Sequence, residues 1–208
     1  MVFQAIKAAI KDTLENQSSG NYDVIGYQRQ SKSSEEFTKE VNVFYRSGTF
    51  PKSAAGIYGS TVKHEIEFEI QYTVSAAAEA DLSILNSEVA TSEEISEALA
   101  AMKDGAYKAD EKIDELFSEV WNVIMNAENA FFGLDDYKVQ DRWLEDMQKD
   151  NPVPQGEYVV LSARSRLTCT VEEIPGGETG TDGTVYNSTV NIQGDPNDNA
   201  GASGTLGG

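Results

Sequence analysis

Cysteine and histidine are nearly absent from this 208-residue chain, which contains one of each, Cys169 and His64. A single cysteine excludes an internal disulfide framework and a cysteine-based zinc cluster. A single histidine excludes a multi-histidine metal site, and it excludes most His-based triads unless another chain supplies the partners. Both residues fall on the apolar side of a predicted strand, so we interpret them as packed core residues.

Basic residues are also scarce, because 16 Lys and Arg face 35 Asp and Glu and leave a formal net charge of −19. A protein that clamps nucleic acid neutralises phosphates with clustered Lys and Arg, whereas this chain repels a phosphate backbone. Repulsion of this kind excludes a nucleic-acid clamp, but it suits a protein past which DNA slides.

Long hydrophobic runs are missing, since no stretch approaches the roughly 18 apolar residues that a membrane-spanning helix needs. The first 17 residues have neither the basic start nor the apolar centre of a signal peptide. We therefore expect no membrane partner and a reducing, cytosol-like compartment.

Motifs that carry catalysis or bind cofactors are absent as well. The sequence contains no P-loop, HExxH, GxSxG or EF-hand pattern. Carboxylates are plentiful, but a run such as Glu65, Glu67 and Glu69 is more typical of a solvated face than of a metal site. The sequence therefore predicts no enzyme, no metal and no cofactor.

Helical spacing of apolar residues marks several segments. The pattern predicts a helix over about 2–15 and a modest helical segment at 76–88. Thr91 with Glu94 fits a capping box at the start of a helical region of about 92–132, either one helix or two in series broken at Gly105. A shorter helix is expected at about 137–148, before the stop signal Asn151-Pro152-Val-Pro154.

Four segments are predicted to be strands, at 22–30, 41–47, 60–75 and 157–172. In the third, seven apolar positions alternate with polar ones, so the strand has one apolar face and one charged face that bears Glu65, Glu67 and Glu69. In the last strand Arg164 and Arg166 share the polar face. If these two strands pair, the arginines stand opposite the glutamates.

Two segments look suited to contacts between chains. The Gly-rich loop 48–61 carries Phe50, Ile57 and Tyr58, which either fold back on the core or dock on a neighbour. The tail 175–208 has no Lys or Arg and nine glycines. It is predicted to be an extended acidic arm, with one strand-like island at Thr184–Ile192 whose key residues are Val185, Tyr186, Val190 and Ile192.

The predicted fold class is α+β. We expect a mixed or antiparallel sheet of about four strands, packed on one face by helices, in the order α-β-β-β-α-α-β. The domain covers residues 1–174, and residues 175–208 form an extended Gly-rich C-terminal arm.

This order of elements resembles the tail-terminator (tail-completion) proteins of long-tailed bacteriophages. Val41-Asn-Val-Phe-Tyr-Arg46 with Ser-Gly-Thr-Phe-Pro51 looks like the second strand and loop of such proteins. His64–Ile70 looks like their long third strand, and Tyr158–Val171 looks like their closing strand. The resemblance covers roughly residues 1–173, and the insertion at 76–111 and the tail depart from it.

The resemblance implies a structural protein of the phage neck. Such a protein forms a ring, usually a hexamer, that caps the head-proximal end of the tail tube and stops its polymerisation. It contacts the tail tube protein and the head-completion or adaptor proteins, and DNA passes through its lumen. The implied location is the virion tail, with assembly in the host cytoplasm. Glu65, Glu67, Glu69, Arg164 and Arg166 would then face the lumen or a neighbouring subunit.

Two other functions stay open at this point. The chain could be another neck component, such as a head-completion, adaptor or tube protein. From a different class, it could be a small acidic binding module that inhibits its target by imitating the charge of DNA.

Overall fold

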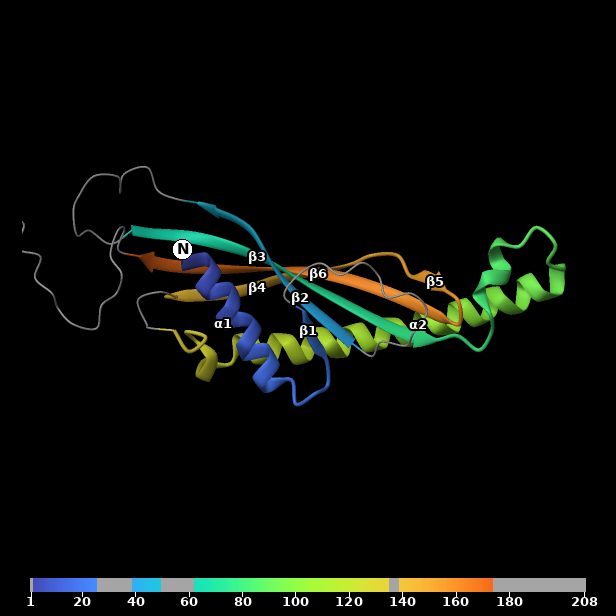
Figure 1. Ribbon diagram of the computed structural model, residues 1–208, viewed down its shortest axis with the longest axis horizontal. Coiled ribbons are helices and arrows are strands. Elements are labelled where there is room, and N and C mark those ends of the chain that lie inside the picture. The colour runs from blue at the N-terminus through green and yellow to red at the C-terminus, as the bar shows by residue number, and fades with distance from the viewer. Residues whose placement is uncertain (1, 26–38, 50–61, 135–138, 174–208) are drawn as a thin grey trace, which may run out of the picture. The chain divides into compact units, whose positions relative to one another are not determined.

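The computed structural model describes residues 2–25, 39–49, 62–134 and 139–173. Within them lie two α-helices, α1 (Val2–Gln17) and α2 (Ser92–Met125), and two short 3-10 helices, η2 (Leu82–Asn86) and η3 (Ala127–Asn129). The strands are β1 (Asp23–Ile25), β2 (Lys39–Thr49), β3 (Val62–Ala77), β4 (Asp141–Lys149), β5 (Val153–Gln155) and β6 (Tyr158–Glu173). The fold is α+β, as the sequence predicts (Figure 1).

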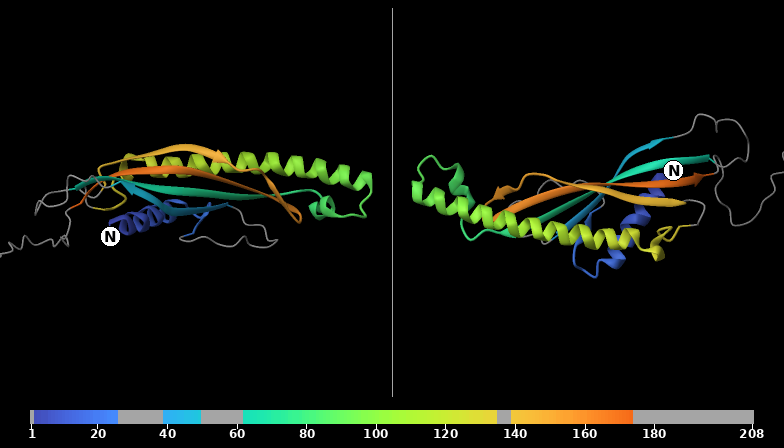
Figure 2. Two further views of the ribbon diagram at one scale, coloured as in Figure 1. Left: turned by 90° about the horizontal axis from the view of Figure 1, so that it is seen from above. Right: turned by 180° about the vertical axis from the view of Figure 1, so that it is seen from behind.

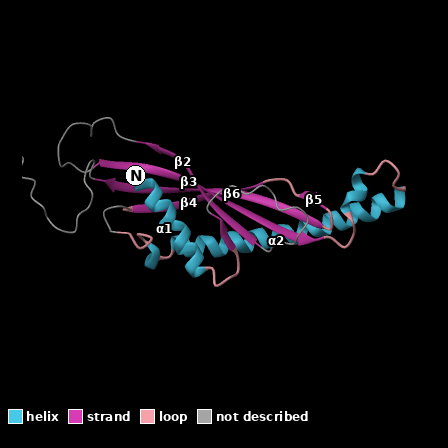
Figure 3. Cartoon of the chain, in the orientation of Figure 1, coloured by secondary structure: helices cyan, strands magenta, loops and turns pink. Residues whose placement is uncertain are grey.

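The strands form one mixed sheet of six strands rather than about four. Its order is β1-β2-β3-β6-β4, and β5 also pairs with β6. Only β1 and β2 run parallel, while β2, β3, β6 and β4 are antiparallel neighbours. The long strands β3 and β6 pair over their whole length, so they form the centre of the sheet (Figure 3).

The core lies between one face of this sheet and both α-helices. Every second side chain of β3 is fully buried, as the alternation predicts: Ile66, Phe68, Ile70, Tyr72 and Val74. They share one cluster with Ile6, Ile10 and Leu14 of α1 and with Ile113, Leu116, Val120 and Ile124 of α2. The sheet is twisted, so its long strands cross in Figure 1, and α2 runs along these strands in both views of Figure 2.

The prediction of a helix at 137–148 is wrong, because Asp141–Lys149 forms strand β4. β4 pairs with β6, with Arg142 opposite Cys169 and Leu144 opposite Leu167. Its apolar residues fit helical spacing, but pairing with the free edge of a long strand outweighs that local pattern. β4 and the short β5 therefore supply two of the strands that the sequence analysis missed.

The region 92–132 contains one long helix that runs through Gly105 and ends at Met125, short of the expected residue 132. The expected capping box is present, with Thr91 and Glu94 exchanging hydrogen bonds. The segment expected to be helical at 76–88 is mostly not, because β3 continues to Ala77 and only the short η2 follows.

Candidate functional site

The candidate site is the sheet face opposite the helices, which we call the open face. Strand alternation and register place on it Asp23, Glu40, Asn42, Phe44, Lys63, Glu65, Glu67, Glu69, Gln71, Thr73, Arg164, Arg166, Thr168, Thr170, Glu172, Asp141, Trp143 and Glu145. Both α-helices pack on the other face, because the buried partners of their apolar stripes are the intervening strand residues. The open face is therefore the polar side of the sheet.

Eight carboxylates and three cationic side chains occupy the open face. Glu65, Glu67 and Glu69 follow one another at every second position of the central strand β3, and Arg164 and Arg166 lie on the adjacent β6. The structure thus brings together the five residues that the sequence analysis singled out. Their pairing divides them into two groups.

The first group is centred on Arg166, which stands opposite Glu69 in the strand register. Its guanidinium reaches Glu67, with Nη1 3.6 Å from Oε1, and it donates hydrogen bonds to Glu145 on β4. These hydrogen bonds lower the pKa of the Glu145 carboxyl and raise the pKa of Arg166. Arg166 therefore links three strands through charge-assisted contacts.

Two neutral donors complete this network. Ser47 of β2 donates its hydroxyl to Glu67 at 2.8 Å, and the Trp143 indole donates to Glu145 at 3.0 Å. Glu67 and Glu145 are therefore held within the sheet. A partner that competed for them would have to displace these contacts.

In the second group, the charged side chains are less fully paired with opposite charges. Arg164 stands opposite Gln71 and pairs with Asp150, at 2.9 Å, just past the end of β4. Lys63 pairs with Glu172 at 3.8 Å. Glu65, opposite Thr170, makes no hydrogen bond or ion pair with any residue in the ranges that the structure describes. Glu65 is therefore not held by an ion pair within the described part of the sheet, in contrast to Glu67 and Glu145.

The single cysteine and the single histidine are both buried on the core side of the sheet. Cys169 is fully buried, and its burial raises the thiol pKa to about 12. His64 is 5% exposed and stands opposite Val171. In the described ranges, no group of three or more His, Cys, Asp or Glu side chains is arranged to hold a metal ion.

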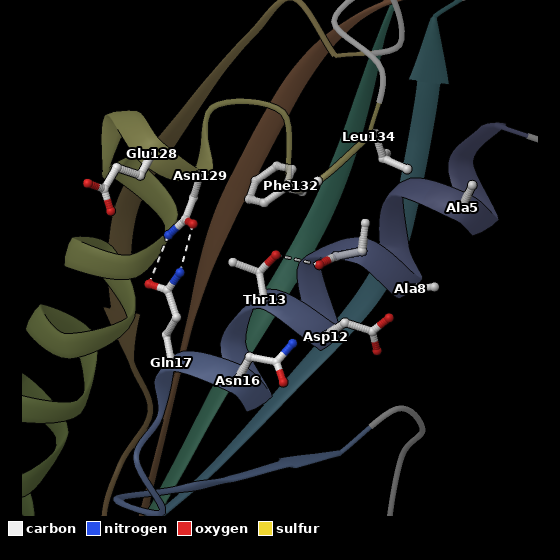
Figure 4. Close-up of a pocket in the computed structure, with 12 residues that line it drawn as sticks. Ala5, Ala8, Asp12, Thr13, Asn16, Gln17, Glu128, Asn129, Phe132 and Leu134 are labelled. Carbon is white, nitrogen blue, oxygen red and sulfur yellow. Dashed lines mark hydrogen bonds between the residues drawn. The ribbon is translucent and has the colours of Figure 1, made fainter.

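A second feature, which the sequence analysis missed, is a groove of about 510 Å³ between α1 and the turn after α2 (Figure 4). Gln17 and Asn129 exchange two side-chain hydrogen bonds across it, at 2.7 and 3.0 Å. Asn129 also donates to the Val123 carbonyl. The two amides satisfy each other's hydrogen bonding, and this pair of hydrogen bonds ties α1 to the turn after α2. Its signal was not in the sequence, since the two amides lie 112 positions apart.

Several predicted contact residues lie outside the described ranges. They are the loop residues Phe50, Ile57 and Tyr58 and the arm residues Val185, Tyr186, Val190 and Ile192. Their expected roles in contacts between chains stay predictions.

None of the helices in the described ranges combines the length and the hydrophobicity that a membrane crossing requires. In comparisons with known proteins, no protein-family model and no curated protein matches this sequence.

Proposed function

We propose that this chain is a structural ring subunit of a phage neck, of the tail-terminator kind. The ring caps the head-proximal end of the tail tube, stops its growth and joins it to the head-completion proteins. DNA passes through the lumen. The observation that carries this proposal is a sheet whose apolar face is covered by both helices while its other face is polar and carries eight carboxylates.

The order of elements supports the proposal. Leaving aside the short β5 and the 3-10 helices, the chain runs α1, β1, β2, β3, α2, β4, β6. This is the order of elements on which the resemblance to tail terminators rests, apart from β4, which lies where the sequence analysis expected a short helix. Two helices on one face leave the opposite face for neighbours or for the lumen.

The charge of the open face supports a surface that DNA passes without binding. A phosphate backbone next to Glu65, Glu69 and their neighbours meets like charge at short range. Two of the three cations on this face, Arg166 and Lys63, are paired with carboxylates of the same face. Few cations are left to hold a phosphate.

The first experiment measures assembly. Light scattering gives the mass in solution, and negative-stain images with and without purified tail tubes show where the protein lies. We expect rings of about six chains at one end of the tubes. A monomer that never joins phage parts would instead support the acidic binding module.

The second experiment tests the open face. Glu65, Glu67 and Glu69 are all replaced by lysine, and the control replaces Glu88, Glu93 and Glu97, which are exposed near or on the start of α2. Both variants change the net charge equally. We expect only the first to disturb ring assembly or to slow DNA passage, read as infectivity. Equal behaviour of the two variants would mean that the open face has no such role.

A further inference from the structure

Both ends of the sheet are open strand edges in the described ranges. At one end β4 pairs with β6 on one side only. At the other end β1 pairs with residues 40–42 of β2, which leaves the outer edge of residues 43–49 unpaired. An edge strand presents unpaired backbone N–H and C=O groups and accepts a further strand readily. Because β3 and β6 lie between the two edges, these edges are open to other chains rather than to each other.

The apolar layer of the core reaches solvent at both edges. At the β2 edge Tyr45 is 39% exposed, and its ring centre lies 4.5 Å from that of Phe3. At the β4 edge Leu144 and Met147 pack against the core but stay partly exposed. Each edge thus ends in apolar side chains that a neighbouring strand would cover.

The two edges also match in length and irregularity. The regular pairing of β2 shifts at Arg46, and that of β4 shifts around Asp146, so each edge has one bulge near its middle. With Arg46 opposite Asp146 and the strands antiparallel, residues 43–49 pair with residues 143–149. This register leaves residues 40–42 to β1.

The faces of the two strands agree in this register only when the strands run antiparallel. Tyr45 then stands opposite Met147, and both face the core. Ser47 stands opposite Glu145, and both lie on the open face. In a parallel arrangement Tyr45 would stand opposite Glu145, which lies on the other face. The alternation of side chains therefore selects the antiparallel pairing.

Arg46 and Asp146 complement each other in charge as well. Both side chains are exposed, and neither has a hydrogen-bond or ion-pair partner among the described residues. Across the contact each would gain an opposite charge. We propose that β4 of one copy pairs antiparallel with residues 43–49 of β2 in a neighbouring copy.

This contact repeats in one direction from copy to copy. β2, β3, β6 and β4 alternate in direction, so a β2 that is antiparallel to β4 points the same way as the β2 of the first copy. Copies joined head to tail in this way close a ring when the rotation between them allows it. The sheet then continues through the ring, with the open face of every copy on the same side. The inference rests on the proposed ring and names the contact that joins its subunits.

The first test exchanges the two charges. Arg46→Glu, Asp146→Arg and a chain with both substitutions are compared with the unaltered chain by light scattering over a range of concentrations. Lys103→Glu, at an exposed position of α2, is the control and changes the net charge as Arg46→Glu does. We expect each single variant to associate at least about tenfold more weakly, and the double variant to recover most of that loss.

Three results of this first test overturn the proposal. They are single variants that associate as the unaltered chain does, a double variant that recovers nothing, and an unaltered chain that stays monomeric. Equal weakening by Lys103→Glu overturns it too, because the effect would then come from net charge alone.

The second test determines the register. Arg46→Cys is made in one chain and Asp146→Cys in another, and the mixed chains are treated with a short bismaleimide. In the control mixture Asp141→Cys replaces Asp146→Cys, since Asp141 is also exposed on β4 but lies about 17 Å further along the strand. The native Cys169 is buried and does not compete. We expect dimers mainly from the first mixture, and equal yields from both mixtures, or no dimers from either, overturn the proposal.

The tests also separate this inference from the proposed function. If rings form at the ends of tail tubes while the cross-link is absent, the edge contact is wrong and the ring stands. If cross-linked dimers form but no rings appear on tail tubes, the edge contact stands and the neck function is wrong.

Discussion

At the scale of single residues, the buried positions differ in how much change they tolerate. Gly105 sits in the middle of α2, where a Cβ would lie 2.8 Å from Cγ2 of Val159 and 3.6 Å from Cβ of Ala78. The glycine is thus required by the close approach of the helix to β6. A sequence pattern alone does not distinguish such a glycine from a helix break.

Replacing Gly105 by alanine is therefore expected to destabilise the protein. Alanine favours a helix over glycine by about 1 kcal/mol. The clash with a fully buried valine costs about 1–3 kcal/mol, and we expect it to outweigh this gain. Chemical denaturation should show a lower free energy of unfolding. In a Val159→Ala background the same substitution should become neutral or stabilising, and if the loss is unchanged there, the clash is not its cause.

Three buried side chains that lose a proton at high pH, one thiol and two phenols, make the stability of the protein sensitive to alkali. Burial raises the pKa of Cys169 from 9.0 to about 12 and that of Tyr22 from 10.0 to about 12, and it also raises the pKa of Tyr72. The folded state keeps these groups protonated, whereas the unfolded chain releases their protons near the ordinary values. The stability they contribute is complete below pH 9 and is lost as the pH rises to about 12.

We expect each of these groups to lower the free energy of unfolding by about 1.4 kcal/mol per pH unit across its own window. Denaturation measured from pH 8 to pH 11 reports this slope. Cys169→Ala should show a shallower slope above pH 9, and an identical slope in that variant would contradict the assignment.

At the scale of elements, β4 holds the end of α2 in place. The Arg142 guanidinium donates to the carbonyls of Ile124 at 2.5 Å, Asn126 at 2.6 Å and Ala130 at 2.9 Å. It also lies 5.4 Å from the centre of the Phe132 ring. Carbonyls at a helix C-terminus lack partners within the helix, so a cation there completes their hydrogen bonding.

Arg142→Met is expected to lower the free energy of unfolding by about 2–4 kcal/mol, because it leaves three carbonyl groups without a charged donor. Arg142→Lys should recover only part of this loss, since an ammonium group lacks the planar fork of the guanidinium. The control is Arg164→Met, which removes an exposed ion pair with Asp150 and should cost less than about 1 kcal/mol. Equal losses in both methionine variants would rule out this capping role.

At the scale of the whole molecule, electrostatic repulsion opposes folding. The chain carries a net charge of −19, and several of its cations already pair with its own carboxylates. Lys149, for example, lies 2.7 Å from both Asp110 and Asp114 and joins β4 to α2. Such surface pairs contribute little individually. The surplus of carboxylates therefore dominates the long-range field.

Added salt is expected to stabilise the protein. Raising the ionic strength from about 0.01 M to about 1 M shortens the screening length from about 30 Å to about 3 Å. Repulsion between carboxylates is then screened, and thermal unfolding should move up by several degrees. Sodium, potassium and choline chloride should act alike. A fall in the melting temperature would mean that the ion pairs outweigh the repulsion.

The sequence by itself determined the elements whose pattern is local and long. The apolar residues Ile66, Phe68 and Ile70 repeat at every second position, which fits only a strand. The apolar residues Ile113, Leu116 and Val120 repeat every three or four positions, which fits only a helix. β3 and most of α2 were therefore predictable from the sequence. The apolar residues of β4 fit helical spacing, and only pairing with β6 made this segment a strand. The tertiary structure also decided that α2 passes unbroken through Gly105 and that Arg166 contacts Glu67 and Glu145. These outcomes depend on residues far apart in the chain, which local periodicity does not report.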